Sequence, residues 1–169
     1  KFKKLPVLLI DGNYFGHRAI HGLNKGGNFS LDTTLEMLQF EDAMYDQLIG
    51  LYKSFNNDYH TLISNIVFVF DGHSWRKDIP PHKPYYIDEH EPIGYKENRV
   101  ENERDNINWD NWRICLINFA ERIQLFLAVF KTEGAEGDDA LLLLTNYLYK
   151  QGIMSIIFCT DGDLKQLIN

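Results

Sequence analysis

Acidic side chains recur at the ends of the apolar runs in this sequence. Asp11 directly follows the run at 6–10, and Asp71 directly follows the run at 66–70. The runs at 127–131 and 154–159 are each followed within a few residues by a group of acids: Glu136, Asp138 and Asp139 after the first, and Asp161 and Asp163 after the second. Like charges a few ångströms apart raise one another's pKa, so acids that meet at one place need a counter-charge. Because the set holds oxygen donors and no His or Cys, it favours Mg²⁺ or Mn²⁺ over zinc.

The order of the predicted elements indicates where these acids meet. The four apolar runs are continuous rather than alternating, which is typical of strands buried on both faces of a parallel sheet. Helical patterns lie between them at about 30–55, with Ser30 as a plausible N-cap, and at about 109–124 and 138–150. Alternating strands and helices predict one α/β domain with a central, mostly parallel sheet. The acids would then share the carboxyl edge of the sheet, where open α/β sheets place their sites.

A carboxylate cluster of this kind would suit phosphoryl chemistry. Two cations about 3.5–4 Å apart activate a water as nucleophile and stabilise the leaving oxygen. A single Asp after a strand is more often a turn former or a helix cap, and capping would explain one acid of "EGDDALLLL" (136–144), Asp138 or Asp139. Acids at four strand ends favour the metal site.

Charge and composition bound the class of protein. The 169 residues carry 24 acids and 17 Lys or Arg, for a net charge of −7. That balance disfavours a nucleic-acid partner, unless cations bound at the acidic cluster reverse the local sign. Cys115 and Cys159 lack metal-ligand spacing and are predicted to be reduced core thiols, which fits a cytoplasmic location. No stretch is apolar for long enough to span a membrane. The polar stretch at 73–108 has several prolines and no clean period, which indicates a functional segment.

The same residues resemble the motifs of the 5′-nuclease superfamily, in the family's order. The similar stretches are "LLIDGNYFGHRAIHG" (8–22), "VFVFDG" (67–72) with "WRKD" (75–78), "YKENR" (95–99), "EGDDALLLL" and "CTDGDLKQLI" (159–168). The family includes flap endonucleases, the 5′-nuclease domains of bacterial DNA polymerases, and phage ribonuclease H and 5′-exonucleases. "WRKD" and "NWDNW" (108–112) look most like phage ribonuclease H, which implies a bacterial cell or a phage-infected host.

The resemblance implies a PIN-like domain over 1–169 with a helical-arch insertion at about 73–108. It implies Arg18, Lys96 and Arg99 as catalytic residues that hold or steer the substrate phosphate. Residues implied to bind nucleic acid are Arg76 and Lys77 at the start of the arch and Tyr95, which would stack on a terminal base. The implied metal ligands, direct or through water, are Asp11, Asp71, Glu136, Asp138, Asp139, Asp161 and Asp163.

The implied function is a Mg²⁺-dependent, structure-specific 5′-nuclease with two metal ions, for which Mn²⁺ could substitute. It would hydrolyse phosphodiesters of DNA, or of RNA in RNA–DNA hybrids, at 5′ ends, flaps or junctions during replication, primer removal or repair. A single-strand-binding protein and a sliding clamp are further implied partners. Two alternatives stay open: a catalytically silent nucleic-acid-binding module on the same fold, and a phosphatase of the haloacid dehalogenase type. The phosphatase needs Asp-x-Asp after its first strand, where this chain has "DGN" (11–13).

The sequence also departs from the family's pattern. Gly137 stands where the family usually has Ala, which is expected to loosen the turn, and His17 stands where an aromatic usually precedes the Arg. The chain begins without Met and ends at "DLKQLIN" (163–169), so both ends are expected to be cut. The family's helix–three-turn–helix part is then expected to be absent from this chain.

Overall fold

The structure is a computed structural model, and it describes residues 4–57, 62–72, 106–160 and 164. The described helices and strands run in the order β1 (Val7–Asp11), α1 (Gly12–Leu23), the 3₁₀ turn η1 (Asn24–Gly26), α2 (Thr34–Asn57), β2 (Asn65–Phe70), α3 (Trp109–Ile123), β3 (Ala128–Lys131), α4 (Gly137–Lys150) and β4 (Ser155–Phe158). Residues 73–105 of the predicted arch lie outside the described residues. None of the helices in the described ranges is long and apolar enough to cross a membrane.

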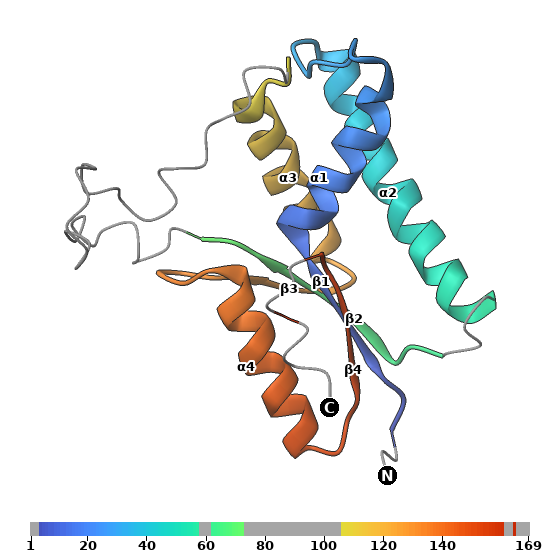
Figure 1. The fold of residues 1–169 in the computed structure, drawn as a ribbon, viewed down its shortest axis with the longest axis vertical. Helices are drawn as coiled ribbons and strands as arrows, with labels where there is room; N and C mark the ends of the chain where they lie inside the picture. Colours follow the sequence, from blue (N-terminus) through green and yellow to red (C-terminus); the bar gives the residue numbers. More distant parts are fainter. Residues whose placement is uncertain (1–3, 58–61, 73–105, 161–163, 165–169) are drawn as a thin grey trace, which may run out of the picture.

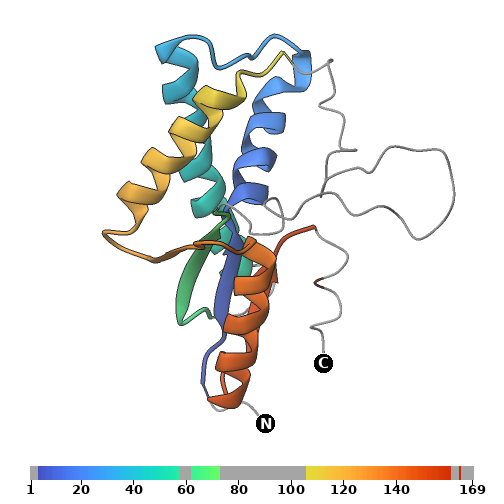
Figure 2. The same ribbon diagram turned by 90° about the vertical axis from the view of Figure 1, so that its left-hand side faces the viewer.

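The four strands form one parallel sheet in the order β3-β2-β1-β4. Helices α1, α2 and α3 lie on one side of this sheet, and α4 lies on the other (Figures 1 and 2). The predicted α/β, PIN-like architecture with a central parallel sheet is confirmed. Because all the strands run the same way, their carboxyl ends lie along one edge, as the acid pattern requires.

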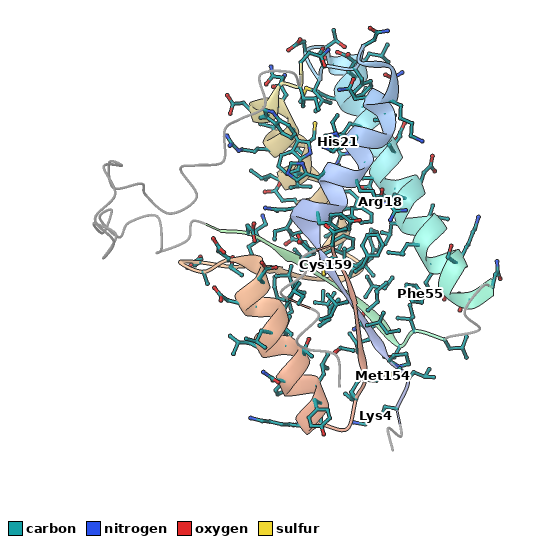
Figure 3. All side chains as sticks on the ribbon, in the orientation of Figure 1. Lys4, Arg18, His21, Phe55, Met154 and Cys159 are labelled. Carbon is teal, nitrogen blue, oxygen red and sulfur yellow. The ribbon has the colours of Figure 1, made fainter. Side chains whose placement is uncertain are left out.

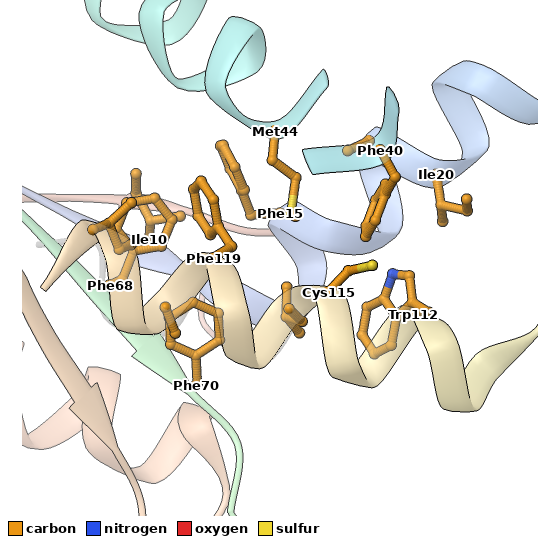
Figure 4. Close-up of a cluster of buried hydrophobic side chains, with 14 of the residues drawn as sticks. Ile10, Phe15, Ile20, Phe40, Met44, Phe68, Phe70, Trp112, Cys115 and Phe119 are labelled. Atoms are coloured by element: carbon orange, nitrogen blue, oxygen red, sulfur yellow. The ribbon is translucent and has the colours of Figure 1, made fainter. Parts of the chain in front are cut away.

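The larger core lies between the sheet and helices α1, α2 and α3 (Figure 4). Phe15 of α1 meets Phe68 of β2 edge-on, with ring centroids 5.2 Å apart, and stacks on Phe119 of α3 at 6.0 Å. Each fully buried side chain of this size stabilises the fold by about 1.5–3 kcal/mol. A smaller cluster under α4 consists of Val7, Leu9, Val67, Val69, Leu141 and Leu164. Strands β1 and β2 are therefore held from both faces, which fixes the positions of the acids that end or follow them.

Helix α1 was not predicted from the sequence, because glycines interrupt its apolar period. Two of these glycines are what let the helix pack closely. A side chain at Gly12 would overlap the ring of Phe70, and one at Gly16 would come within 2.8 Å of Leu116 and 3.0 Å of Trp112. The residues that lower helix propensity are thus the ones that allow α1 to lie against β2 and α3.

Helix α2 begins later than predicted, and Ser30 is not its N-cap. Thr33 and Glu36 bond reciprocally instead: the Glu36 N–H donates to Thr33 Oγ1 at 3.2 Å, and the Thr33 N–H donates to Glu36 Oε2 at 3.1 Å. This is a capping box, a stronger start signal than a lone Ser. The N–H of Ser30 also donates to Glu36, at 3.1 Å, so Ser30 braces the loop ahead of the helix.

The described end of the predicted arch, residues 106–108, is anchored to the loop before α2. The N–H of Asn108 donates to the carbonyl of Ser30 at 2.7 Å, and its side-chain amide donates to Asp32 at 3.0 Å. The side-chain oxygen of Asn108 also accepts from the N–H of Asn111 and caps α3. Asn108 is therefore fixed to both the loop before α2 and the first turn of α3.

A glycine just beyond β2 yields a stability prediction. The N–H of Gly72 donates to Thr132 Oγ1 at 2.7 Å, and a Cβ at residue 72 would overlap the carbonyl oxygen of Thr132. We expect Gly72→Ala to lower the free energy of unfolding by about 1–3 kcal/mol, because backbone atoms must move. Gly50→Ala is the matched control: nothing lies near Gly50 in α2, and the change should add about 0.5–1 kcal/mol. If urea unfolding shows the same change in the free energy of unfolding for both variants, the close contact between Gly72 and Thr132 is contradicted.

Candidate functional site

Asp11 is both the last residue of β1 and the N-cap of α1. Its Oδ1 accepts a hydrogen bond from the N–H of Tyr14 at 3.0 Å. Burial raises the pKa of Asp11 from its ordinary 3.8 to about 6; the charges of Asp71 and Asp138 act in the same direction, and the Tyr14 hydrogen bond opposes them. The ends of β1 and β2 and the start of α4 thus bring three carboxylates within electrostatic range of one another.

Asp71 directly follows β2 and contacts the first turn of α4. Its Oδ1 accepts from the N–H of Gly137 at 2.5 Å, and its Oδ2 accepts from the side-chain amide of Asn13 at 2.9 Å. A Cβ at residue 137 would lie 2.5 Å from Asp71 Oδ1. The glycine that was expected to loosen the turn instead allows the carboxylate to approach the helix N-terminus, where negative charge is favoured.

The three acids at the start of α4 have different surroundings. Glu136 is the N-cap and Asp139 is the third helical residue, and together they form a capping box. The Asp139 carboxylate accepts from the N–H of Glu136 at 3.3 Å. Capping therefore involves two of these acids, where the sequence argument allowed for one. The charge of Asp138 acts on Asp11 and raises its pKa.

Thr132 ties the loop between β3 and α4 to the end of β2. Its hydroxyl accepts from the N–H of Gly72 at 2.7 Å and donates to the carbonyl of Ala135 at 2.7 Å. Its own N–H donates to the carbonyl of Phe70 at 3.1 Å. This loop therefore cannot shift along β2 without breaking the bonds of Thr132 to Phe70 and Gly72. These bonds keep the start of α4 close to Asp71.

The predicted site residues fall into two groups. Asp11, Asp71, Glu136, Asp138 and Asp139 all lie at the carboxyl edge of the sheet, and Arg18 lies on the exposed side of α1. The predicted residues outside the described part of the chain are Arg76, Lys77, Tyr95, Lys96, Arg99, Asp161 and Asp163.

Three residues that support the site were missed in the sequence: Asn13, Thr132 and, in its supporting role, Gly137. Asn13 bonds to a residue 58 positions away, and Thr132 bonds to one 60 positions away. Neither contact has a periodic signal in the sequence. The Asp-Gly-Asn triplet at 11–13 was the available hint, since a side chain in the first turn after a strand end is placed to reach the end of the neighbouring strand.

The acids at the carboxyl edge of the sheet are the type of ligand that a hard cation prefers. Among residues 4–57, 62–72, 106–160 and 164, no three His, Cys, Asp or Glu side chains form a group that could hold a metal ion. Both oxygens of Asp71 accept hydrogen bonds. The metal ligands that these acids offer are all oxygens. The charges of Asp71 and Asp138 add to the raised pKa of Asp11, and a cation beside them would reduce that repulsion. The ligand role of the acids stays a prediction.

The fold is similar to solved structures from phage T5. The D15 protein of T5, co-crystallised with metal ions, matches 97% of this chain and 51% of its own at a TM-score of 0.63 and 17% identity. A T5 flap endonuclease complex with DNA and metal ions has a TM-score of 0.61 and 17% sequence identity. The match covers 97% of this chain and 52% of the T5 chain. A T5 5′-exonuclease with bound zinc has a TM-score of 0.61 and 18% sequence identity, and the match covers 97% of this chain and 52% of the T5 chain.

At these identities the likeness concerns the fold. The chain shares the fold of these T5 proteins, and it spans about half of their length. Comparison with models of protein families gives no match, and neither does comparison with the sequences of curated proteins.

The raised pKa of Asp11 predicts a pH-dependent stability. The folded state holds this proton more tightly than the unfolded state, so the contribution of Asp11 to stability is full below about pH 4 and is lost as the pH rises through about 6. The difference of about two pKa units corresponds to about 3 kcal/mol. Asp11→Asn keeps a capping side chain and should therefore raise the free energy of unfolding by about 1–3 kcal/mol near pH 8. Near pH 4 the gain should be small.

The measurement is urea unfolding of both proteins in EDTA at the two pH values. Asp46→Asn is the control, since Asp46 is exposed on α2. It should give no pH-dependent gain. A gain for Asp11→Asn that is the same at both pH values would contradict the electrostatic origin.

Proposed function

We propose that this chain is the catalytic domain of a Mg²⁺-dependent, structure-specific 5′-nuclease. The observation that supports this most directly is the convergence of Asp11, Asp71 and Asp138 at the carboxyl edge of a sheet with the 5′-nuclease fold. Like charges held close together destabilise a fold unless a counter-charge offsets their repulsion, and divalent cations that bridge a phosphodiester would supply that counter-charge. The metal ions in the T5 structures support the same reading.

In this proposal the carboxylates hold two divalent cations, and further ligands come from Asp161 and Asp163. When bound, the cations would supply a nucleophilic water and neutralise charge on the leaving oxygen. The protein's part is to fix the carboxylates. Asn13 and the Gly137 N–H orient Asp71, and the start of α1 orients Asp11.

Cationic side chains would hold the nucleic acid against this edge. Arg18 contacts a phosphate from α1, and Lys96 and Arg99 steer the scissile phosphate, where positive charge stabilises the transition state. Tyr95 stacks on a terminal base, and Arg76 and Lys77 contact the strand as it enters the arch. The substrate is DNA, or RNA in an RNA–DNA hybrid, with a 5′ end, flap or junction, and the products carry 5′-phosphates. A single-strand-binding protein and a sliding clamp are the proposed partners in replication or repair.

Loss of single carboxylates tests the proposal in a protein that contains this chain and the remainder of its natural sequence. Asp71→Asn and Asp161→Asn should each lower the cleavage rate at least about a hundredfold, because the loss of several kcal/mol of charge stabilisation is expected. Binding of the same substrate should persist. The measurement is single-turnover cleavage of labelled flap, nicked and RNA–DNA substrates in Mg²⁺ and in EDTA.

Two controls separate the possible outcomes. Asp46→Asn removes a charge from exposed α2 and should cut at the wild-type rate. Thermal unfolding of each variant shows whether the fold is retained. If the wild-type protein binds these substrates and cuts none of them in Mg²⁺, the chain is a silent nucleic-acid-binding module and the proposal is wrong. Cleavage that survives both substitutions would contradict the metal mechanism.

A further inference from the structure

The guanidinium of Arg18 rests on an aromatic ring at the end of β4. Its central carbon lies 5.3 Å from the ring centroid of Phe158. Figure 3 shows Arg18 on α1 above the sheet end that carries Cys159, the residue after Phe158. Phe158 pairs in register with Ile10 of β1, so it lies one residue before the level of Asp11. Arg18 is therefore held at the same edge of the sheet as the carboxylates.

The ring of Phe158 also fixes the first turns of α1. Its centroid lies 5.5 Å from that of Tyr14 and 6.3 Å from that of Phe15. Tyr14 is the residue whose N–H donates to Asp11, and Arg18 is four residues further on, one helical turn away. One ring thus contacts both the turn that orients Asp11 and the turn that carries Arg18.

Arg18 differs from other arginines of the described chain in what holds it. Arg113 pairs with Asp110, and Arg122 pairs with Glu41. Among the described residues no carboxylate forms an ion pair with Arg18, although the chain has 24 acids. An aromatic face orients a guanidinium without using its N–H groups, so all five remain available for a phosphate. Segment 12–26, which contains Arg18, has no Asp or Glu to compete for it.

We propose that Phe158 is a positioning residue, which holds Arg18 in the orientation that binds a phosphate of the nucleic acid at the carboxylate edge. This inference rests on the proposed function and adds to it a residue outside the acidic motifs. Phe158 also packs against the larger core, so the alternative is that its ring only stabilises the fold. The two roles differ in what happens to Arg18.

The first test needs no nucleic acid. In Phe158→Leu, which keeps an apolar side chain, the Arg18 Nε–Hε signal in an NMR spectrum should lose its ring-current shift and move toward the position of a mobile arginine. In Phe158→Tyr, which keeps an aromatic face, the signal should stay near its wild-type position. Phe29→Leu is the control, because Phe29 is also a partly buried aromatic packed against the larger core, in a different loop. It should leave the Arg18 signal unchanged.

The second test is binding of a short, phosphorothioate-linked, 5′-phosphorylated oligonucleotide in Mg²⁺. Phe158→Leu should weaken binding about two- to fivefold, the range expected for one exposed cation–π contact. Phe158→Tyr should restore it. In an Arg18→Ala background the change Phe158→Leu should have no further effect, because the two residues act through one contact.

The outcomes separate the two proposals. An unchanged Arg18 signal in Phe158→Leu, or equal losses of binding with and without Arg18, would overturn the positioning role. If the wild-type protein does not bind the oligonucleotide, the proposed function fails and the phosphate-binding role of Arg18 fails with it. A shifted Arg18 signal would then show a structural contact alone.

Discussion

One hydrogen bond joins the two halves of the carboxylate site. The Asp71 carboxylate follows the central strand β2 and accepts from the first N–H of α4, at Gly137. Helix α4 lies on the opposite face of the sheet from α1, and the same carboxylate accepts from Asn13 of α1, so Asp71 contacts helices on both faces of the sheet (Figure 2). The contact with α4 requires a residue without a side chain at 137. Through it, the acids at the start of α4 are held beside those at the ends of β1 and β2.

The crowding of these carboxylates is unfavourable for stability. Asp11 is half-buried, and desolvation together with the charges of Asp71 and Asp138 raises its pKa to about 6, so the ionised form of Asp11 is disfavoured at this position. The buried strands and the bonds of Thr132 and Asn13 hold the acids in place against this repulsion. Under the proposed function, a cation bound at this edge together with a phosphate would offset the repulsion.

The strands and their polarity could be predicted from the sequence because each is a continuous apolar run that ends near an acid. The prediction that the acids share one edge of the sheet followed from the parallel direction of the strands. Helix α1 could not be predicted, because Gly12 and Gly16 interrupt its apolar period. Their packing role is visible only in the structure, where Gly12 lies against Phe70 and Gly16 lies against Leu116 and Trp112. The partners of Asp71 were also out of reach, because Asn13 and Gly137 contact it across 58 and 66 positions of chain. Local patterns specify elements well, and they carry little information about which side chain from one element orients a side chain on another.

The most direct measurement of the central claim is a Mn²⁺ titration of the chain, followed by NMR of the side-chain carboxyl carbons. If the carboxylate edge gathers a divalent cation, paramagnetic broadening should reach Asp11, Asp71 and Asp138 together, at a Mn²⁺ concentration that leaves the exposed acids Asp42 and Asp46 of α2 sharp. Competition with Mg²⁺ should restore the broadened signals. Broadening that affects Asp42 and Asp46 at the same Mn²⁺ concentration, or that spares Asp11 and Asp71, would contradict a cation site at this edge of the sheet.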